Sequence, residues 1–187
     1  MQKKSDIIIG GLQNPLHLKL VSFFICTSAL IVMIGWWTQS PFIVQLTPRF
    51  ETIKFNSAVL LFLSGLALYL AAPHSRLSGC IGALIALLSA TVGSQYILNM
   101  SYGIDTLFVE PFVLKRTVYP GRFSPNTSIS YICVGISFLF LSLQSKSLLK
   151  YKYFFSATLA SITVSLAVGT LFGYVSGIVS DSVWSFT

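Results

Sequence analysis

The residues best able to do chemistry lie in one polar segment, Met100–Asn126, between long apolar runs. This segment holds five of the chain's charged residues: Asp105, Glu110, Lys115, Arg116 and Arg122. Asp105 follows one apolar run and Arg122 precedes the next, so an ion pair between them would close the segment across two helix ends. Asp105, Glu110, Arg122 and Asn126 are therefore the candidate loop-closing or signal-sensing residues.

The arrangement of nucleophiles and metal-ligating residues does not indicate an enzyme. The three cysteines, Cys26, Cys80 and Cys133, fall inside apolar runs and lack CxxC spacing, which argues against disulfide or zinc sites. His17 and His74 lie at the ends of apolar runs, whereas paired haem ligands would face each other within the bundle. We expect no catalytic residue, no metal and no cofactor.

The elements that carry the polar segment read as membrane-spanning helices. Hydrophobic residues make up 54% of the 187-residue chain and charged residues 9%, against about 25% charged in soluble domains. Apolar runs of about 18 residues or more predict spanning helices. We predict an all-α integral membrane protein with a tail at 1–18, a membrane domain at 19–187 and a loop at 100–125. The predicted spans are 20–37, 56–72, 77–98, 126–143 and 153–175.

The distribution of basic residues predicts the orientation. With the N-terminus inside, seven Lys or Arg residues lie on the inner side and five on the outer side, as the positive-inside rule requires. The tail would be cytoplasmic, and loop 100–125 and the C-terminus extracytoplasmic. The net charge of +7 lies in the connectors, which favours lipid headgroups over nucleic acid as the partner.

An internal repeat relates the second and fourth predicted spans. Asn56 matches Asn126 and Gly65 matches Gly135, both at an offset of 70 residues. Each unit is a helix, a turn and a returning helix, so the two repeats are parallel. Both asparagines are candidate N-caps. Chance similarity between apolar helices is the alternative explanation.

Small and amide side chains mark predicted helix contacts. Gly65, Gly93 and Gly135 lie in spans rich in small residues, which let helix backbones approach closely. Gln95 is the most polar residue late in its span. We interpret it as an interhelical hydrogen-bonding residue rather than a ligand site.

Two motifs in the loop carry a resemblance to a known family. "GID-x-L" at Gly103–Leu107 and "PGR-x-SPNT" at Pro120–Thr127 resemble a bacterial membrane-integral input region, found ahead of PAS, histidine-kinase or diguanylate-cyclase modules. Lys54–Leu68 and Gly173–Thr187 are similar to the same pattern. The resemblance covers about residues 20–187, and the helices themselves are not distinctive.

The resemblance implies a non-catalytic sensory module in the bacterial inner membrane. A further helix pair and a cytoplasmic effector are expected beyond the position of Thr187, where this sequence stops. The signal would then pass to an effector on the same or another chain, with self-association as a further expectation. The alternative is a structural or accessory subunit of a larger membrane complex. For the loop itself, a stimulus-sensing patch competes with a packed connecting segment, and we favour packing.

Overall fold

The protein is all-helical in a computed structural model that describes residues 15–45, 52–113, 119, 121–143 and 149–176. The predicted all-α class is confirmed, since every regular element in these ranges is a helix. The elements, in chain order, are α2 (Pro15–Trp37), α3 (Pro41–Val44), α4 (Phe55–Leu70), α5 (Ser75–Ile97), η1 (Ile104–Thr106), α6 (Pro125–Ser142) and α7 (Leu149–Val175).

Within the described ranges, four helices are long and apolar enough to cross a membrane: α2, α5, α6 and α7. The remaining predicted span, 56–72, corresponds to α4, which is apolar but has 16 residues. At 1.5 Å per residue it is about 24 Å long, somewhat shorter than a hydrocarbon core of about 30 Å. The chain is thus a multi-pass membrane protein with one shorter helix inside its bundle.

The predicted span boundaries differ from the helices mainly at their first residues. α2 begins at Pro15, so residues 15–18 are helical and do not belong to a tail; residues 1–14 lie outside the described ranges. α7 begins at Leu149, four residues before the prediction. In both cases the prediction started after the last basic residue, whereas the helix continues past the apolar run. Proline is favourable in the first helical turn, where its missing N–H has no partner to lose.

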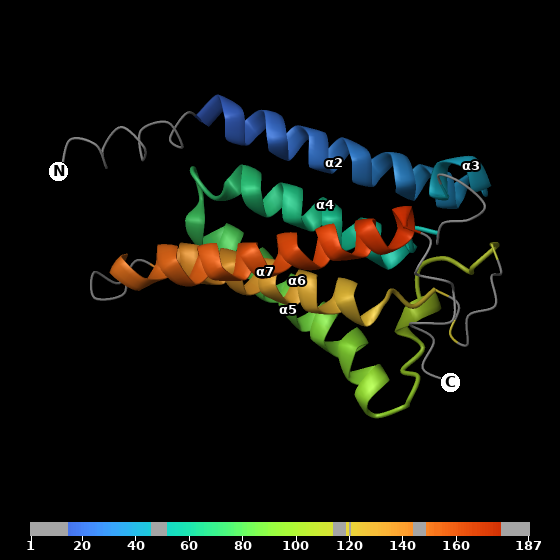
Figure 1. The fold of residues 1–187 in the computed structure, drawn as a ribbon. Helices are drawn as coiled ribbons and strands as arrows, with labels where there is room; N and C mark the ends of the chain where they lie inside the picture. The colour runs from blue at the N-terminus through green and yellow to red at the C-terminus, as the bar shows by residue number, and fades with distance from the viewer. Residues whose placement is uncertain (1–14, 46–51, 114–118, 120, 144–148, 177–187) are drawn as a thin grey trace.

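The helices run alternately up and down, so that their connections fall at two ends of the bundle (Figure 1). We call one of them the loop end: there α2, α5 and α7 finish, α4 and α6 begin, and the described parts of the Met100–Asn126 segment lie. Successive long helices pack against each other, and α6 also touches α4. This order places α4, α5 and α6 together beneath the loop.

The hairpins α4–α5 and α6–α7 run in the same direction, as the parallel repeat predicts. Their first residues, Phe55 and Pro125, lie 70 positions apart, the offset seen in the sequence. The predicted caps are wrong, however. Lys54 caps α4 without a side-chain bond and Ser124 caps α6 by accepting from the Thr127 N–H. Asn56 and Asn126 each lie two residues after the cap, inside the first turn.

Glycines occur where two helices approach most closely. A Cβ added at Gly135 would lie 2.5 Å from the Gly82 carbonyl oxygen of α5, and one at Gly82 would lie 2.6 Å from the Gly135 carbonyl oxygen. Gly65 faces Cys26 of α2, and Gly93 faces Ser128 of α6. These positions admit only a hydrogen because the facing helix occupies the space of a side chain.

Candidate functional site

The candidate site begins with a sharp reversal of the chain after α5. Asn99 and Gly103 both have positive φ, 51° and 73°, a region that L-residues other than Asn, Asp and Gly enter at a cost. The short helix η1 follows and contains Asp105. This reversal returns Asp105 to the end of α5 and buries it, at 7% exposure.

Asp105 and Arg122 form a buried ion pair. The Arg122 Nε lies 2.9 Å from Asp105 Oδ2, and Arg122 is 4% exposed. The two charges come from opposite ends of the loop, 17 residues apart. The pair therefore joins the segment after α5 to the segment before α6.

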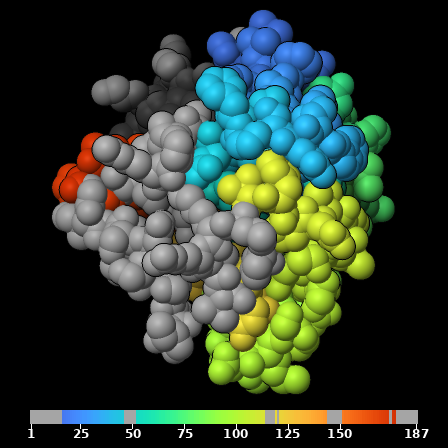
Figure 2. All heavy atoms as spheres, turned by 90° about the vertical axis from the view of Figure 1, so that its right-hand side faces the viewer, coloured from blue at the N-terminus to red at the C-terminus, as the bar shows by residue number. Residues whose placement is uncertain are grey.

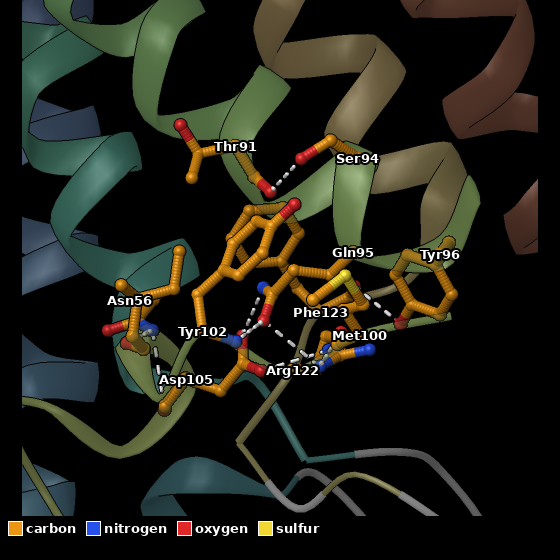
Figure 3. A network of polar contacts seen from close by, with 11 residues as sticks. Asn56, Thr91, Ser94, Gln95, Tyr96, Met100, Tyr102, Asp105, Arg122 and Phe123 are labelled. Atoms are coloured by element: carbon orange, nitrogen blue, oxygen red, sulfur yellow. Dashed lines mark hydrogen bonds and ion pairs between the residues drawn. The ribbon is translucent and has the colours of Figure 1, made fainter. Parts of the chain in front are cut away.

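Gln95 of α5 completes this arrangement (Figure 3). Its Nε2 donates to Asp105 Oδ1 at 3.2 Å, and its Oε1 accepts from Arg122 Nη2 at 3.0 Å and from the Tyr102 N–H at 2.8 Å. Gln95 is fully buried. We call Gln95, Asp105 and Arg122 the polar cluster; each member contacts both of the others.

Two tyrosines and a backbone carbonyl surround the guanidinium of Arg122. The carbon at its centre lies 3.9 Å from the ring centroid of Tyr119 and 5.3 Å from that of Tyr96, within cation–π range. Its Nη2 also donates to the Met100 carbonyl at 3.3 Å. Its Nη1 is buried and has no hydrogen-bond partner among the described residues. The Tyr96 hydroxyl donates to the Phe123 carbonyl, so α5 also holds the backbone beside the arginine.

Asn56 and Gly121 hold the backbone around Asp105. The Asn56 side chain donates to the carbonyls of Ile104 at 3.0 Å and Asp105 at 3.3 Å, which links the start of α4 to the loop. Gly121 has φ of 88°, and a Cβ there would lie 2.5 Å from the Asp105 carbonyl oxygen. Glycine is needed at this position for both reasons.

The apolar part of the loop packs on the corner formed by α2 and α3. Phe112 meets Trp36 edge to face with ring centroids 5.1 Å apart, and Val109 and Val113 pack on the same cluster. The Trp36 indole N–H donates to the Ile53 carbonyl. In Figure 2, which views the loop end, this yellow segment lies directly against the blue-to-cyan α2–α3 corner.

The structure brings some of the predicted site residues together and leaves others apart. Asp105, Arg122, Gln95 and Asn56 meet in one connected set of bonds. Glu110 is exposed and takes no part in it. Asn126 lies on a groove described below, and the three predicted packing glycines, Gly65, Gly93 and Gly135, lie at helix contacts.

Tyr96, Tyr119 and Gly121 were not among the predicted site residues. Gly121 belongs to the PGR-x-SPNT motif, but its contact with Asp105 depends on how the loop folds back. Tyr96 follows Gln95 directly, and Tyr119 precedes Arg122 by three residues. The only sign of the two tyrosines in the sequence is their position close to Gln95 and Arg122.

The polar cluster holds the two ends of the loop against α5. Its acid and base neutralise each other, and no group of three His, Cys, Asp or Glu side chains that could hold a metal occurs in the described ranges. Comparison with protein-family models, with curated proteins and with solved structures found no match.

Proposed function

We propose that this chain is the membrane-integral input module of a bacterial signal-transduction protein, non-catalytic by itself. In this proposal it lies in the inner membrane with its N-terminus in the cytoplasm and the loop end outside. The stimulus acts on the loop, and the response passes through the helices to an effector on the same or another chain. The motif resemblance and the distribution of basic residues support this assignment.

The observation that carries the proposal is the buried polar cluster. A buried ion pair is weak evidence for stability, because desolvation offsets its attraction, but it can fix one conformation among several. Here it holds the loop against α5 while Asn56 holds it to α4. A stimulus can act only by binding more tightly to one of two states, here the state in which Asp105 and Arg122 are separated. Binding to that state would free the loop from both α5 and α4.

A chimaera tests this role. The chain is joined after Thr187 to one further transmembrane helix and the kinase of a protein of the resembled class, so that the kinase lies on the cytoplasmic side, and autophosphorylation is measured in membrane vesicles. Asp105→Asn and Arg122→Gln should each change kinase output roughly tenfold or more, since about 1.4 kcal/mol between two states alters their ratio tenfold.

Glu110→Gln is the matched control, because it removes an exposed acid from the same loop. It should leave kinase output unchanged. Folded Asp105→Asn and Arg122→Gln chimaeras with wild-type output and wild-type stimulus response would contradict the loop-centred mechanism.

A second candidate function is an accessory subunit of a membrane complex, which the exposed face of α7 favours. Ala157, Ser161, Ser165 and Gly169 are spaced by four residues and exposed, and no atom of the described part of the chain lies within 4 Å of a Cβ built at Gly169. Such a face suits a partner helix. Purification from native membranes in mild detergent separates the two functions: a stoichiometric partner without a signalling domain favours the subunit.

A further inference from the structure

A groove of about 600 Å³ runs along α6 between α4 and α7. It lies in the membrane-spanning part of the bundle, and its volume falls within the range of about 300–1,000 Å³ typical of ligand sites. Its walls include Leu61 and Leu68 of α4, Val134 and Phe138 of α6, and Leu166 of α7. None of the three residues of the polar cluster lines the groove, so the groove is separate from the site described above.

Two polar side chains at the loop end of the groove lack partners. Asn126 and Ser130 lie one turn apart on α6, both line the groove, and neither side chain has a hydrogen-bond partner within the described residues. By contrast, the hydroxyls of Ser64, Thr163 and Thr170 donate to carbonyls of their own helices. A polar side chain without a partner in a largely apolar groove is unfavourable, so an occupant that pairs with it is favoured.

The equivalent position in the first repeat shows the same side chain satisfied. Asn56, 70 residues earlier and at the same place in its helix, donates to two loop carbonyls. No described part of the loop does this for Asn126. A carbonyl oxygen is therefore the acceptor that this helix position binds elsewhere in the same molecule.

The charge and length of the groove narrow the class of occupant. The described residues that line the groove include no Asp, Glu, Lys, Arg or His, which suits an uncharged polar group. From Asn126 to Phe138 the groove extends about 18 Å at 1.5 Å per residue, close to the roughly 15 Å depth of one leaflet's hydrocarbon. Asn126 lies in the first turn of a helix long enough to span a membrane, and the ends of spanning helices are expected in the interfacial region that holds the lipid ester groups.

We propose that this groove binds one acyl chain of a glycerolipid, with its ester carbonyl accepting hydrogen bonds from the Asn126 amide and the Ser130 hydroxyl. The chain extends along α6 toward Phe138, and the charged headgroup stays outside the bundle at the loop end. This site is independent of the sensory role, because its recognition uses none of the residues of the polar cluster.

Two photoactivatable lipids test the site in the 187-residue chain reconstituted into vesicles of ether-linked phosphatidylcholine, which does not itself offer an ester carbonyl. One is a phosphatidylcholine with an ester-linked acyl chain that carries a mid-chain diazirine, and the other is its ether-linked analogue, which lacks the carbonyl. Labelled peptides are quantified by mass spectrometry. The ester lipid should label the groove walls saturably, at roughly three- to tenfold lower concentration than the ether lipid, as one or two hydrogen bonds allow.

Variants assign the labelling to the groove. In the Asn126→Leu variant, the ester lipid should need the same concentration as the ether lipid to label the groove walls. Ala167→Trp, at a lining position, should abolish labelling, whereas Val168→Trp, at the next residue, which is exposed outside the groove, should leave it unchanged. Equal labelling of the wild-type protein by both lipids, labelling that does not saturate, or no labelling of the groove walls would overturn the proposal, and none of these results depends on a variant folding.

Discussion

At the scale of single residues, each buried charge of the polar cluster contacts more than one group, although Arg122 Nη1 has no hydrogen-bond partner among the described residues. Asp105 bonds both Arg122 and Gln95, and Arg122 adds the Met100 carbonyl and two aromatic faces. Removal of one partner of a buried pair leaves an uncompensated charge and costs about 3–5 kcal/mol. The cluster thus penalises other loop conformations more than it raises overall stability.

Substitutions at Gly103 and Gly121 distinguish the cost of backbone strain from the cost of a close contact. Both have positive φ, but a Cβ at Gly121 would strike the Asp105 carbonyl, while one at Gly103 would meet no atom of the described residues within 4 Å. Gly103→Ala should lower the free energy of unfolding by roughly 1–2 kcal/mol. Gly121→Ala should lower it further and displace Asp105, as measured by thermal unfolding in detergent. Equal losses in the two variants would contradict the close approach.

Replacement of Gln95 tests how far the stability of the polar cluster depends on its uncharged member. Gln95→Leu keeps the volume but removes the acceptor of Arg122 Nη2 and of the Tyr102 N–H, so it should cost about 1–3 kcal/mol. Thr91→Ala, which removes an exposed hydroxyl on the same helix, should change stability by less than about 0.5 kcal/mol. A Gln95 variant as stable as the Thr91 variant would show that the amide bonds are dispensable.

The sequence allowed the ionic pair to be predicted but not its surroundings. Asp105 and Arg122 lie beside predicted helix ends, and helix ends joined by a closing loop must be neighbours. The partners of Gln95 and the stacking of Tyr119 depend on the reversals at Asn99, Gly103 and Gly121. These backbone conformations follow from the whole loop, so local residue preferences did not reveal them.

At the scale of helices, apolar run length predicted the elements well and their ends less well. The spans were found because a bilayer crossing requires about 20 apolar residues. Their starts were misplaced because helices such as α2 continue beyond the apolar run. The caps were misassigned because Asn56 donates to the loop rather than accepting from its own helix.

The closest helix contact, between α5 and α6, can be tested with one methyl group. Gly135→Ala places that group against the backbone of Gly82 and Ala86 and should lower the free energy of unfolding by about 1–3 kcal/mol. Gly169→Ala adds the same group where nothing lies within 4 Å and should be neutral or stabilising, since alanine favours the helix by up to about 1 kcal/mol. The comparison uses unfolding in mixed micelles, and a tolerated Gly135→Ala would exclude the tight crossing.

At the scale of the molecule, the alternating helices place Thr106 and His74 at opposite ends of the bundle. Both residues are exposed. In intact cells, with the native cysteines replaced, a cysteine at Thr106 should react with a membrane-impermeant maleimide. A cysteine at His74 should react only after permeabilisation. The reverse pattern would overturn the proposed orientation while leaving the fold unchanged.

Asp105 and Arg122 act as one unit that holds the loop against the helices. A double-mutant cycle measures this directly, from the unfolding free energies of Asp105→Asn, Arg122→Gln and the combined variant in detergent. We expect each single change to cost about 3–5 kcal/mol and the double change to cost less than their sum by about 1–3 kcal/mol. Two losses that add within about 0.5 kcal/mol would show that the residues act independently and would contradict the account.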